Sequence, residues 1–197
     1  VKFNDTLNLY VFSDGSFDFI SELKAPTLKA STTSDNFVKL SWNNTGDKIS
    51  YEIYRSATGS DFVKIATADG TAYTDNTVVA GNRYYYQIRA YYSEYDVYVV
   101  SDIKRVTVLD APVITKVTYG DGTVTLTWNK VAGADHYSVH LMNSPAFDGM
   151  TDAGNTAETT ITLNDLPEDK YLVVCALDTE TAGSSLFSVS VPTTIPV

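Results

Sequence analysis

The stretch Val38-Lys39-Leu40-Ser41-Trp42 recurs 86 residues later as Val124-Thr125-Leu126-Thr127-Trp128. In both stretches apolar and polar residues alternate, which is the pattern of a β-strand with one buried face. Three further pairs share this offset: Ala25-Pro26 with Ala111-Pro112, Tyr51 with Tyr137, and Ile53 with Val139. A constant offset across separate elements indicates two consecutive homologous modules, with Trp42 and Trp128 at equivalent core positions.

Both modules are predicted to be all-β. Apolar residues alternate over short runs, clusters of turn-forming residues separate these runs, and no segment longer than a turn has helical spacing. The pattern fits seven short strands in each copy, so we expect β-sandwich modules at residues 25–109 and 110–197. The connection at residues 108–112 contains no Gly or Ser spacer, which favours a restricted linker.

Residues 1–24 lie outside the repeat. The apolar runs Leu7–Phe12 and Phe17–Ile20 flank a turn at Ser13–Ser16, which predicts a β-hairpin. Two strands alone are only marginally stable in water. The hairpin therefore either packs on the first module or is the remnant of an upstream domain.

Each copy resembles a fibronectin type III module. The features that carry the resemblance are an N-terminal Pro, a second-strand Trp, a third-strand Tyr and a tyrosine corner. The corner reads Leu166-Pro167-Glu168-Asp169-Lys170-Tyr171 in the second copy and Ala80-Gly81-Asn82-Arg83-Tyr84 in the first, with Ala80 where the family usually has Pro. The resemblance covers Ala25 to about Val197 and implies seven-stranded immunoglobulin-like sandwiches. It also implies that Tyr84 and Tyr171 are buried and bond to backbone just upstream.

Within this family, the runs Tyr51–Ser56 and Tyr84–Ala90 are most similar to modules attached to secreted bacterial carbohydrate-active and surface proteins. The resemblance thus implies a non-catalytic structural spacer in a larger extracellular or cell-surface protein. Its partners would be the other domains of the same polypeptide. The alternative is an adhesion module that binds a glycan or a protein.

Composition excludes some partners. Asp and Glu outnumber Lys and Arg by 24 to 14, for a formal charge of −10, whereas nucleic acid binding requires a basic face. No apolar run approaches the roughly 18 residues of a membrane helix, so we expect no membrane insertion. The single Cys175 lies in the apolar run Tyr171–Leu177, which favours a buried, inert thiol.

The sequence has no pattern typical of catalysis or metal binding. His136 and His140 are four residues apart in a predicted strand, which places them about 13 Å apart, too far to share a metal ion. No Gly-x-Ser-x-Gly motif is present, and acidic residues such as Asp47 and Asp121 lie in turns, where they bend or cap the backbone. We therefore expect no catalytic residue, no metal and no cofactor.

The Tyr-rich segment 91–98 is the candidate ligand-binding site. If one strand ends near Ala90 and the next begins at about Ser101, this segment is the loop between them. The matching segment Asp178–Gly183 is shorter and has no aromatic residue, so the fold itself does not need these tyrosines. The candidate residues are Tyr91, Tyr92, Glu94, Tyr95, Asp96 and Tyr98.

Tyrosine suits a binding surface because it combines a large stacking area with a polar tip, and carboxylates accept hydrogen bonds from sugar hydroxyls or basic partners. Tyr54 and Tyr85 are expected on the same outer sheet face. The alternative is that several of these rings extend the last two strands as a long hairpin. They would then pack on the neighbouring module or on the N-terminal segment.

Overall fold

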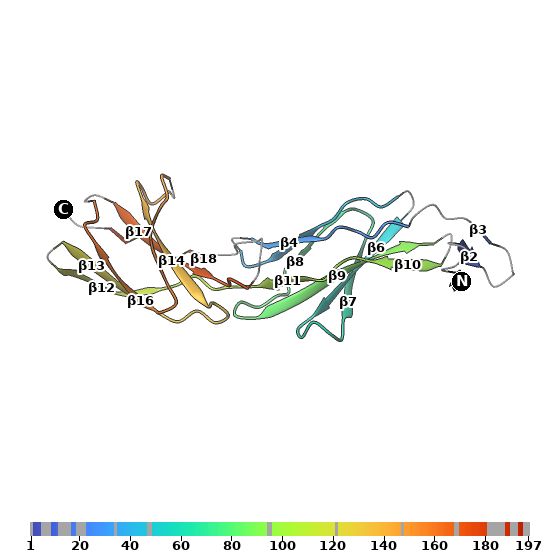
Figure 1. The fold of residues 1–197 in the computed structure, drawn as a ribbon, viewed down its shortest axis with the longest axis horizontal. Coiled ribbons are helices and arrows are strands. Elements are labelled where there is room, and N and C mark those ends of the chain that lie inside the picture. The colour runs from blue at the N-terminus through green and yellow to red at the C-terminus, as the bar shows by residue number, and fades with distance from the viewer. Residues whose placement is uncertain are drawn as a thin grey trace. The chain divides into compact units, whose positions relative to one another are not determined.

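The computed structural model shows a chain built from β-strands (Figure 1). The residues that the structure describes are 2–4, 9–11, 17–18, 23–33, 35–46, 49–93, 96–120, 122–146, 148–167, 170–180, 188–189 and 193–194. Within these ranges there is no helix, as the sequence pattern predicted. Accordingly, none of the described segments is a helix long and apolar enough to cross a membrane.

The chain divides into two compact units. The first comprises Val1–Ser31, Val38–Asp75 and Tyr84–Val106. The second comprises Thr32–Phe37, Asn76–Arg83 and Thr107–Val197.

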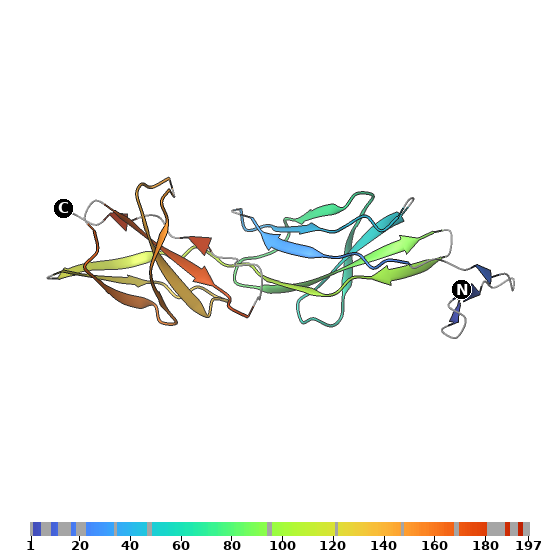
Figure 2. The ribbon, with the colours of Figure 1, turned by 45° about the horizontal axis from the view of Figure 1, so that its top comes forward.

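In the first unit, a three-stranded sheet and a larger sheet form the two layers visible in Figures 1 and 2. The smaller sheet has the order β4 (Lys29–Thr32), β5 (Val38–Ser41), β8 (Ala72–Asp75). The larger sheet has the order β10 (Val97–Val100), β9 (Arg83–Tyr92), β6 (Ile49–Ser56), β7 (Val63–Ala68), and β11 (Lys104–Thr107) also pairs with β9.

The core of the first unit follows from the alternation along its strands. The buried side chains include Leu28, Val38, Leu40, Trp42, Tyr51, Ile53, Tyr86, Ile88 and Ala90. The ring centroids of Trp42 and Tyr51 are 5.5 Å apart, with the planes tilted by 59°. Burial of one such large apolar side chain stabilises the fold by about 1.5–3 kcal/mol.

The second unit follows the same plan. One sheet has the order β12 (Ile114–Gly120), β13 (Thr123–Trp128), β16 (Thr160–Asn164). The other has the order β15 (Thr151–Thr156), β14 (His136–Met142), β17 (Tyr171–Leu177), β18 (Ser188–Val189), and β19 (Thr193–Thr194) also pairs with β17. Trp128 is buried 5.3 Å from the ring of Tyr137, so the prediction of two equivalent core tryptophans is confirmed.

Equivalent hydrogen bonds brace both cores. The Thr45 N–H donates to the Tyr51 hydroxyl at 3.0 Å, and the Val131 N–H donates to the Tyr137 hydroxyl at 2.9 Å. A buried tyrosine hydroxyl needs such a partner, and in each unit the preceding loop provides it. The repeat therefore extends from side-chain types to individual hydrogen bonds.

The expectation that the corner tyrosines are buried is wrong. Tyr84 and Tyr171 are half-buried, because they lie at the beginning of β9 and β17. The fully buried tyrosine of β9 is Tyr86, whose hydroxyl donates to Asp75 Oδ2 at 2.9 Å. Arg55 forms an ion pair with the same carboxylate at 2.8 Å, so the charge of Asp75 is compensated inside the core.

Apart from β1–β3, each sandwich has eight strand segments among the described residues, β4–β11 and β12–β19, rather than the expected seven, because the last strand is in two pieces. In the first unit Ser101 lies between β10 and β11. Its N–H donates to the Ile88 carbonyl at 2.9 Å, and its hydroxyl accepts the Ile88 N–H at 2.9 Å. The interruption therefore leaves both backbone groups of Ile88 paired.

The N-terminal segment also differs from the prediction. Three strands, β1 (Lys2–Asn4), β2 (Leu9–Val11) and β3 (Phe17–Asp18), form an antiparallel sheet where a two-stranded hairpin was expected. The additional strand pairs through Lys2–Asn4, a stretch too short for alternation to be recognised in the sequence.

Candidate functional site

The Tyr-rich segment is mostly strand, so the loop expected at residues 91–98 is wrong and the alternative of an extended hairpin holds. β9 extends to Tyr92 and β10 begins at Val97, which places Tyr91 and Tyr98 in paired strands. Pairing continues past Ala90 because the valine-rich β10 favours extended structure. Glu94 and Tyr95 lie outside the described residues.

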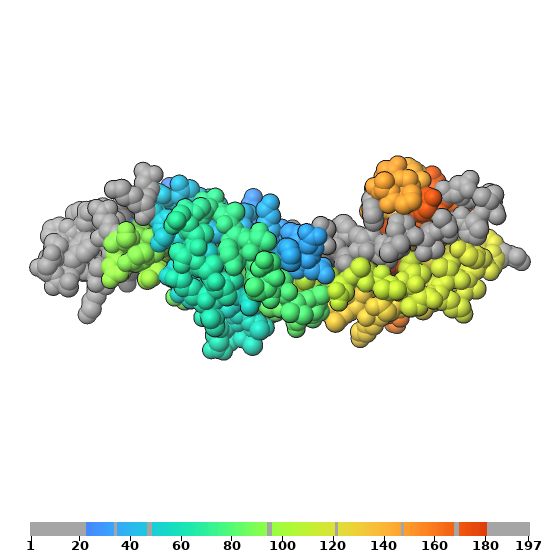
Figure 3. Space-filling view, turned by 180° about the vertical axis from the view of Figure 1, so that it is seen from behind, coloured from blue at the N-terminus to red at the C-terminus, as the bar shows by residue number. Residues whose placement is uncertain are grey.

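Tyr91 and Tyr98 face each other across this hairpin. They are direct cross-strand partners whose ring centroids are 4.7 Å apart, with the planes tilted by 31°. Both lie on the outer face of the sheet, since the adjacent Ala90 is buried. Tyr98 is 48% exposed, and β10 is an edge strand of the sheet among the described residues. The end of this hairpin is visible on the surface in light green in Figure 3.

Asp96 fixes the ring of Tyr91. The Tyr91 hydroxyl donates to Asp96 Oδ1 at 2.9 Å, and this hydrogen bond raises the pKa of Tyr91. Asp96 has a φ of 51°, a left-handed turn conformation that aspartate tolerates better than most residues. By contrast, the Tyr98 hydroxyl has no hydrogen-bond partner among the described residues and can bond to a ligand.

Tyr92 has a structural role. Its hydroxyl lies 3.2 Å from the Lys24 carbonyl and 3.4 Å from the Thr45 carbonyl, so it ties the start of the first unit to the loop that precedes β6. This contact matches the packing alternative considered for the segment. The structure thus brings Tyr91, Asp96 and Tyr98 together but separates Tyr92 from them.

A surface hollow lies at the start of β6. It has a volume of about 650 Å³ and is lined by Asn44, Gly46, Ile49, Ser50, Tyr51, Asp69, Gly70 and Thr71. Ser50, which lines the hollow, is the register partner of Tyr91 on the neighbouring strand β6, so the hollow begins one strand away from Tyr91. Amide, hydroxyl and carboxylate groups line the hollow, which makes it suitable for a ligand that carries many hydroxyl groups.

Charged side chains of β6, β7 and β9 lie on the same outer face of the sheet as the tyrosine pair. Lys64 is hydrogen-bonded to Glu52, which lowers the pKa of that carboxyl. The Tyr54 hydroxyl donates to Glu52 Oε2 at 3.1 Å, and the Arg89 guanidinium lies 3.9 Å from the centroid of the Tyr54 ring. Sequence reasoning placed Tyr54 on this face but missed the other three. Glu52 and Arg89 could have been found because they alternate with buried residues of β6 and β9.

The histidines, the cysteine and the acidic residues were the other candidates for metal binding or catalysis. The described part of the chain contains no group of three or more His, Cys, Asp or Glu residues that could hold a metal ion. The Nε2 atom of His140 is hydrogen-bonded to the Ser138 hydroxyl at 2.9 Å. Cys175 is a free thiol whose pKa is raised by burial to about 11, which confirms the prediction that the thiol is buried.

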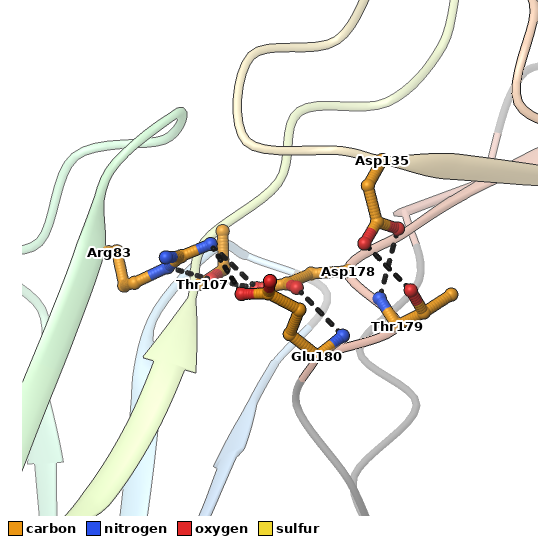
Figure 4. Close-up of polar contacts among 6 residues, drawn as sticks. All are labelled: Arg83, Thr107, Asp135, Asp178, Thr179 and Glu180. Carbon is orange, nitrogen blue, oxygen red and sulfur yellow. Dashed lines mark hydrogen bonds and ion pairs between the residues drawn. The ribbon is translucent and has the colours of Figure 1, made fainter.

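A second polar cluster lies within Asn76–Arg83 and Thr107–Val197, two segments of the second unit (Figure 4). Thr107 donates to the buried Asp178 at 2.5 Å, and Arg83 lies 3.6 Å from the same carboxylate oxygen. Asp135 accepts hydrogen bonds from the N–H and hydroxyl of Thr179 at 3.0 and 2.7 Å. These carboxylates are engaged by neighbouring donors, which indicates that the cluster holds the start of the segment after β17 in place.

Curated relatives are large enzymes. No family model matches the chain. It is 32% identical over 155 residues to an amylopullulanase from Thermoanaerobacter thermohydrosulfuricus and 39% identical over 67 residues to a poly(3-hydroxybutyrate) depolymerase from Ralstonia pickettii. The matches cover 75% and 34% of this chain but only 10% and 13% of those relatives. The chain thus corresponds to a small part of each protein.

Among solved structures, an Fn3-like protein from Clostridium thermocellum is 33% identical to this chain, with a TM-score of 0.39. The match covers 92% of that protein and 43% of this chain. This sequence identity over nearly all of an Fn3-like protein agrees with the Trp and Tyr core found in both units. The chain therefore belongs to the fibronectin type III-like family of β-sandwich modules.

Proposed function

We propose that the chain is a non-catalytic accessory region of a larger extracellular enzyme that degrades a polymer, and that its two units space the catalytic domain from its surroundings. The observation that carries the proposal is the similarity to the amylopullulanase, where 155 aligned residues make up 10% of the protein. A region of this kind is a small accessory part of a large enzyme. Its partners are then the other domains of the same polypeptide.

The hydrogen bonds and ion pairs made by two carboxylates support a non-catalytic role. Glycoside hydrolysis needs two carboxyl groups that face one substrate. Here Asp75 is bonded to Arg55 and Tyr86 within the core, and Glu52 is bonded to Lys64 on the surface. Both carboxylates therefore stabilise the fold through these contacts.

The name of the first relative directs the choice of polymer. We take an α-glucan such as pullulan as the polymer of the proposed enzyme, and the polyester named in the second relative as the alternative. An extracellular location follows from this role, because polymers of this size are degraded outside the cell.

Two measurements test the proposal. The gene that encodes the full-length polypeptide should contain a separate catalytic domain, and the purified chain should release no sugar from pullulan or soluble starch and no hydroxy acid from poly(3-hydroxybutyrate). Product release by the chain that a point substitution abolishes would overturn the proposal. So would a full-length polypeptide without a catalytic domain.

A further inference from the structure

We infer that Tyr91, Tyr98 and the hollow beside Ser50 form a binding surface for a neutral α-glucan chain. The choice of α-glucan rests on the proposed function, whereas the site rests on the arrangement of these residues. The region that is proposed as a spacer would then also bind the polymer that the enzyme degrades.

The tyrosine pair provides the stacking surface. With ring centroids 4.7 Å apart and Asp96 holding Tyr91, the pair is ordered before any ligand arrives. Preorganised aromatic side chains lose little conformational entropy on binding. Tyr98 lies on the edge strand with half of its surface exposed, so an apolar sugar face can stack on its ring.

The hollow provides the hydrogen-bonding groups. Ser50, the register partner of Tyr91 on the neighbouring strand, lines the hollow together with the polar residues Asn44, Asp69 and Thr71. An aromatic platform next to a few convergent polar groups is the usual composition of a small-molecule site. A glucan chain that stacks on Tyr98 therefore finds donors and acceptors for its hydroxyls within the same surface.

The charges near the site favour a neutral polymer. The chain carries a formal charge of −10, and Asp69 and Asp96 contribute carboxylates at the site itself. The nearby cations are already engaged, Lys64 by Glu52 and Arg89 by the ring of Tyr54. An anionic polysaccharide would meet repulsion here, whereas the hydroxyl groups of a glucan can donate to these carboxylates.

The test is migration of the chain through native gels that contain pullulan, amylose or no polymer. We expect both glucans to retard the unmodified chain, and Tyr98→Ala and Tyr91→Ala to weaken binding about tenfold or more. Tyr98→Trp, which keeps a stacking face, should preserve retardation, and Asp69→Ala should weaken it. The matched control is Tyr119→Ala, since Tyr119 is 47% exposed on β12 of the other unit and should bind normally.

Thermal unfolding of each variant shows that a loss of binding is not a loss of folding. The inference is overturned if neither glucan retards the chain, if Tyr98→Ala and Tyr119→Ala behave alike, or if the chain binds poly(3-hydroxybutyrate) granules instead. A protein partner that pairs with the edge of β10 would bind independently of both rings and also overturns it. These outcomes are separate from the proposed function, which depends on the catalytic domain and on turnover.

Discussion

At the scale of single residues, one hydroxyl group in each core connects a buried ring to a loop. Tyr51 and Tyr137 occupy the same position in the repeat, and each accepts a backbone N–H from six residues upstream. The family resemblance assigned such a role to Tyr84 and Tyr171, which lie half-buried at strand ends. Burial therefore decides which tyrosine hydroxyl matters for stability.

Tyr137→Phe tests this assignment. The substitution keeps the ring beside Trp128 but leaves the buried N–H of Val131 without its acceptor. We expect a loss of about 1–3 kcal/mol in the free energy of unfolding, measured by urea denaturation. The control Tyr171→Phe should cost less than about 0.5 kcal/mol. Equal losses for the two variants would show that the corner tyrosine, after all, has the bracing role.

The contribution of Asp135 to the stability of the fold should depend on pH. Burial would raise its pKa, but the hydrogen bonds from Thr179 outweigh burial and lower it. The unfolded chain has the ordinary aspartate pKa of about 3.9, so the stabilisation is complete above that pH and is lost as the pH falls towards the lowered value. The difference in urea midpoint between the unmodified chain and Asp135→Ala should therefore be larger at pH 7 than at pH 3. A difference that does not change with pH would contradict this role.

At the scale of elements, Ser101 keeps the interrupted last strand of the first unit attached to β9. Ser101→Ala removes the acceptor of the buried Ile88 N–H. We expect a loss of about 1–3 kcal/mol in the free energy of unfolding. Ser93→Ala, in the exposed turn of the hairpin, is the control and should leave the urea midpoint unchanged. A midpoint for Ser101→Ala that matches this control would rule out the bracing role.

Alternation predicted most of the strands, because period two depends only on which face is buried. It placed Val38 and Leu40 in the core correctly. It failed where the choice depended on pairing: the hairpin continued to Tyr92 because β10 was available as a partner. Pairing is a long-range property that a local pattern does not contain.

At the scale of the whole molecule, the candidate site combines segments that are far apart in sequence. Tyr91, Asp96 and Tyr98 could be predicted together because they are close in the chain. The hollow could not, since its lining comes from Asn44, Gly46, residues 49–51 and residues 69–71. Such a surface exists only once β6, β9 and the loop before β8 have been brought together by folding.

Under the proposed function, this chain assists an enzyme without performing its chemistry. The most direct test is to delete residues 1–197 from the full-length polypeptide and to measure kcat on soluble pullulan and the rate on granular starch. We predict that kcat on soluble pullulan stays within about twofold, because the reacting groups lie elsewhere, while the rate on granules falls. A loss of activity on soluble pullulan, with the remaining domains folded, would show that the chain takes part in the reaction itself.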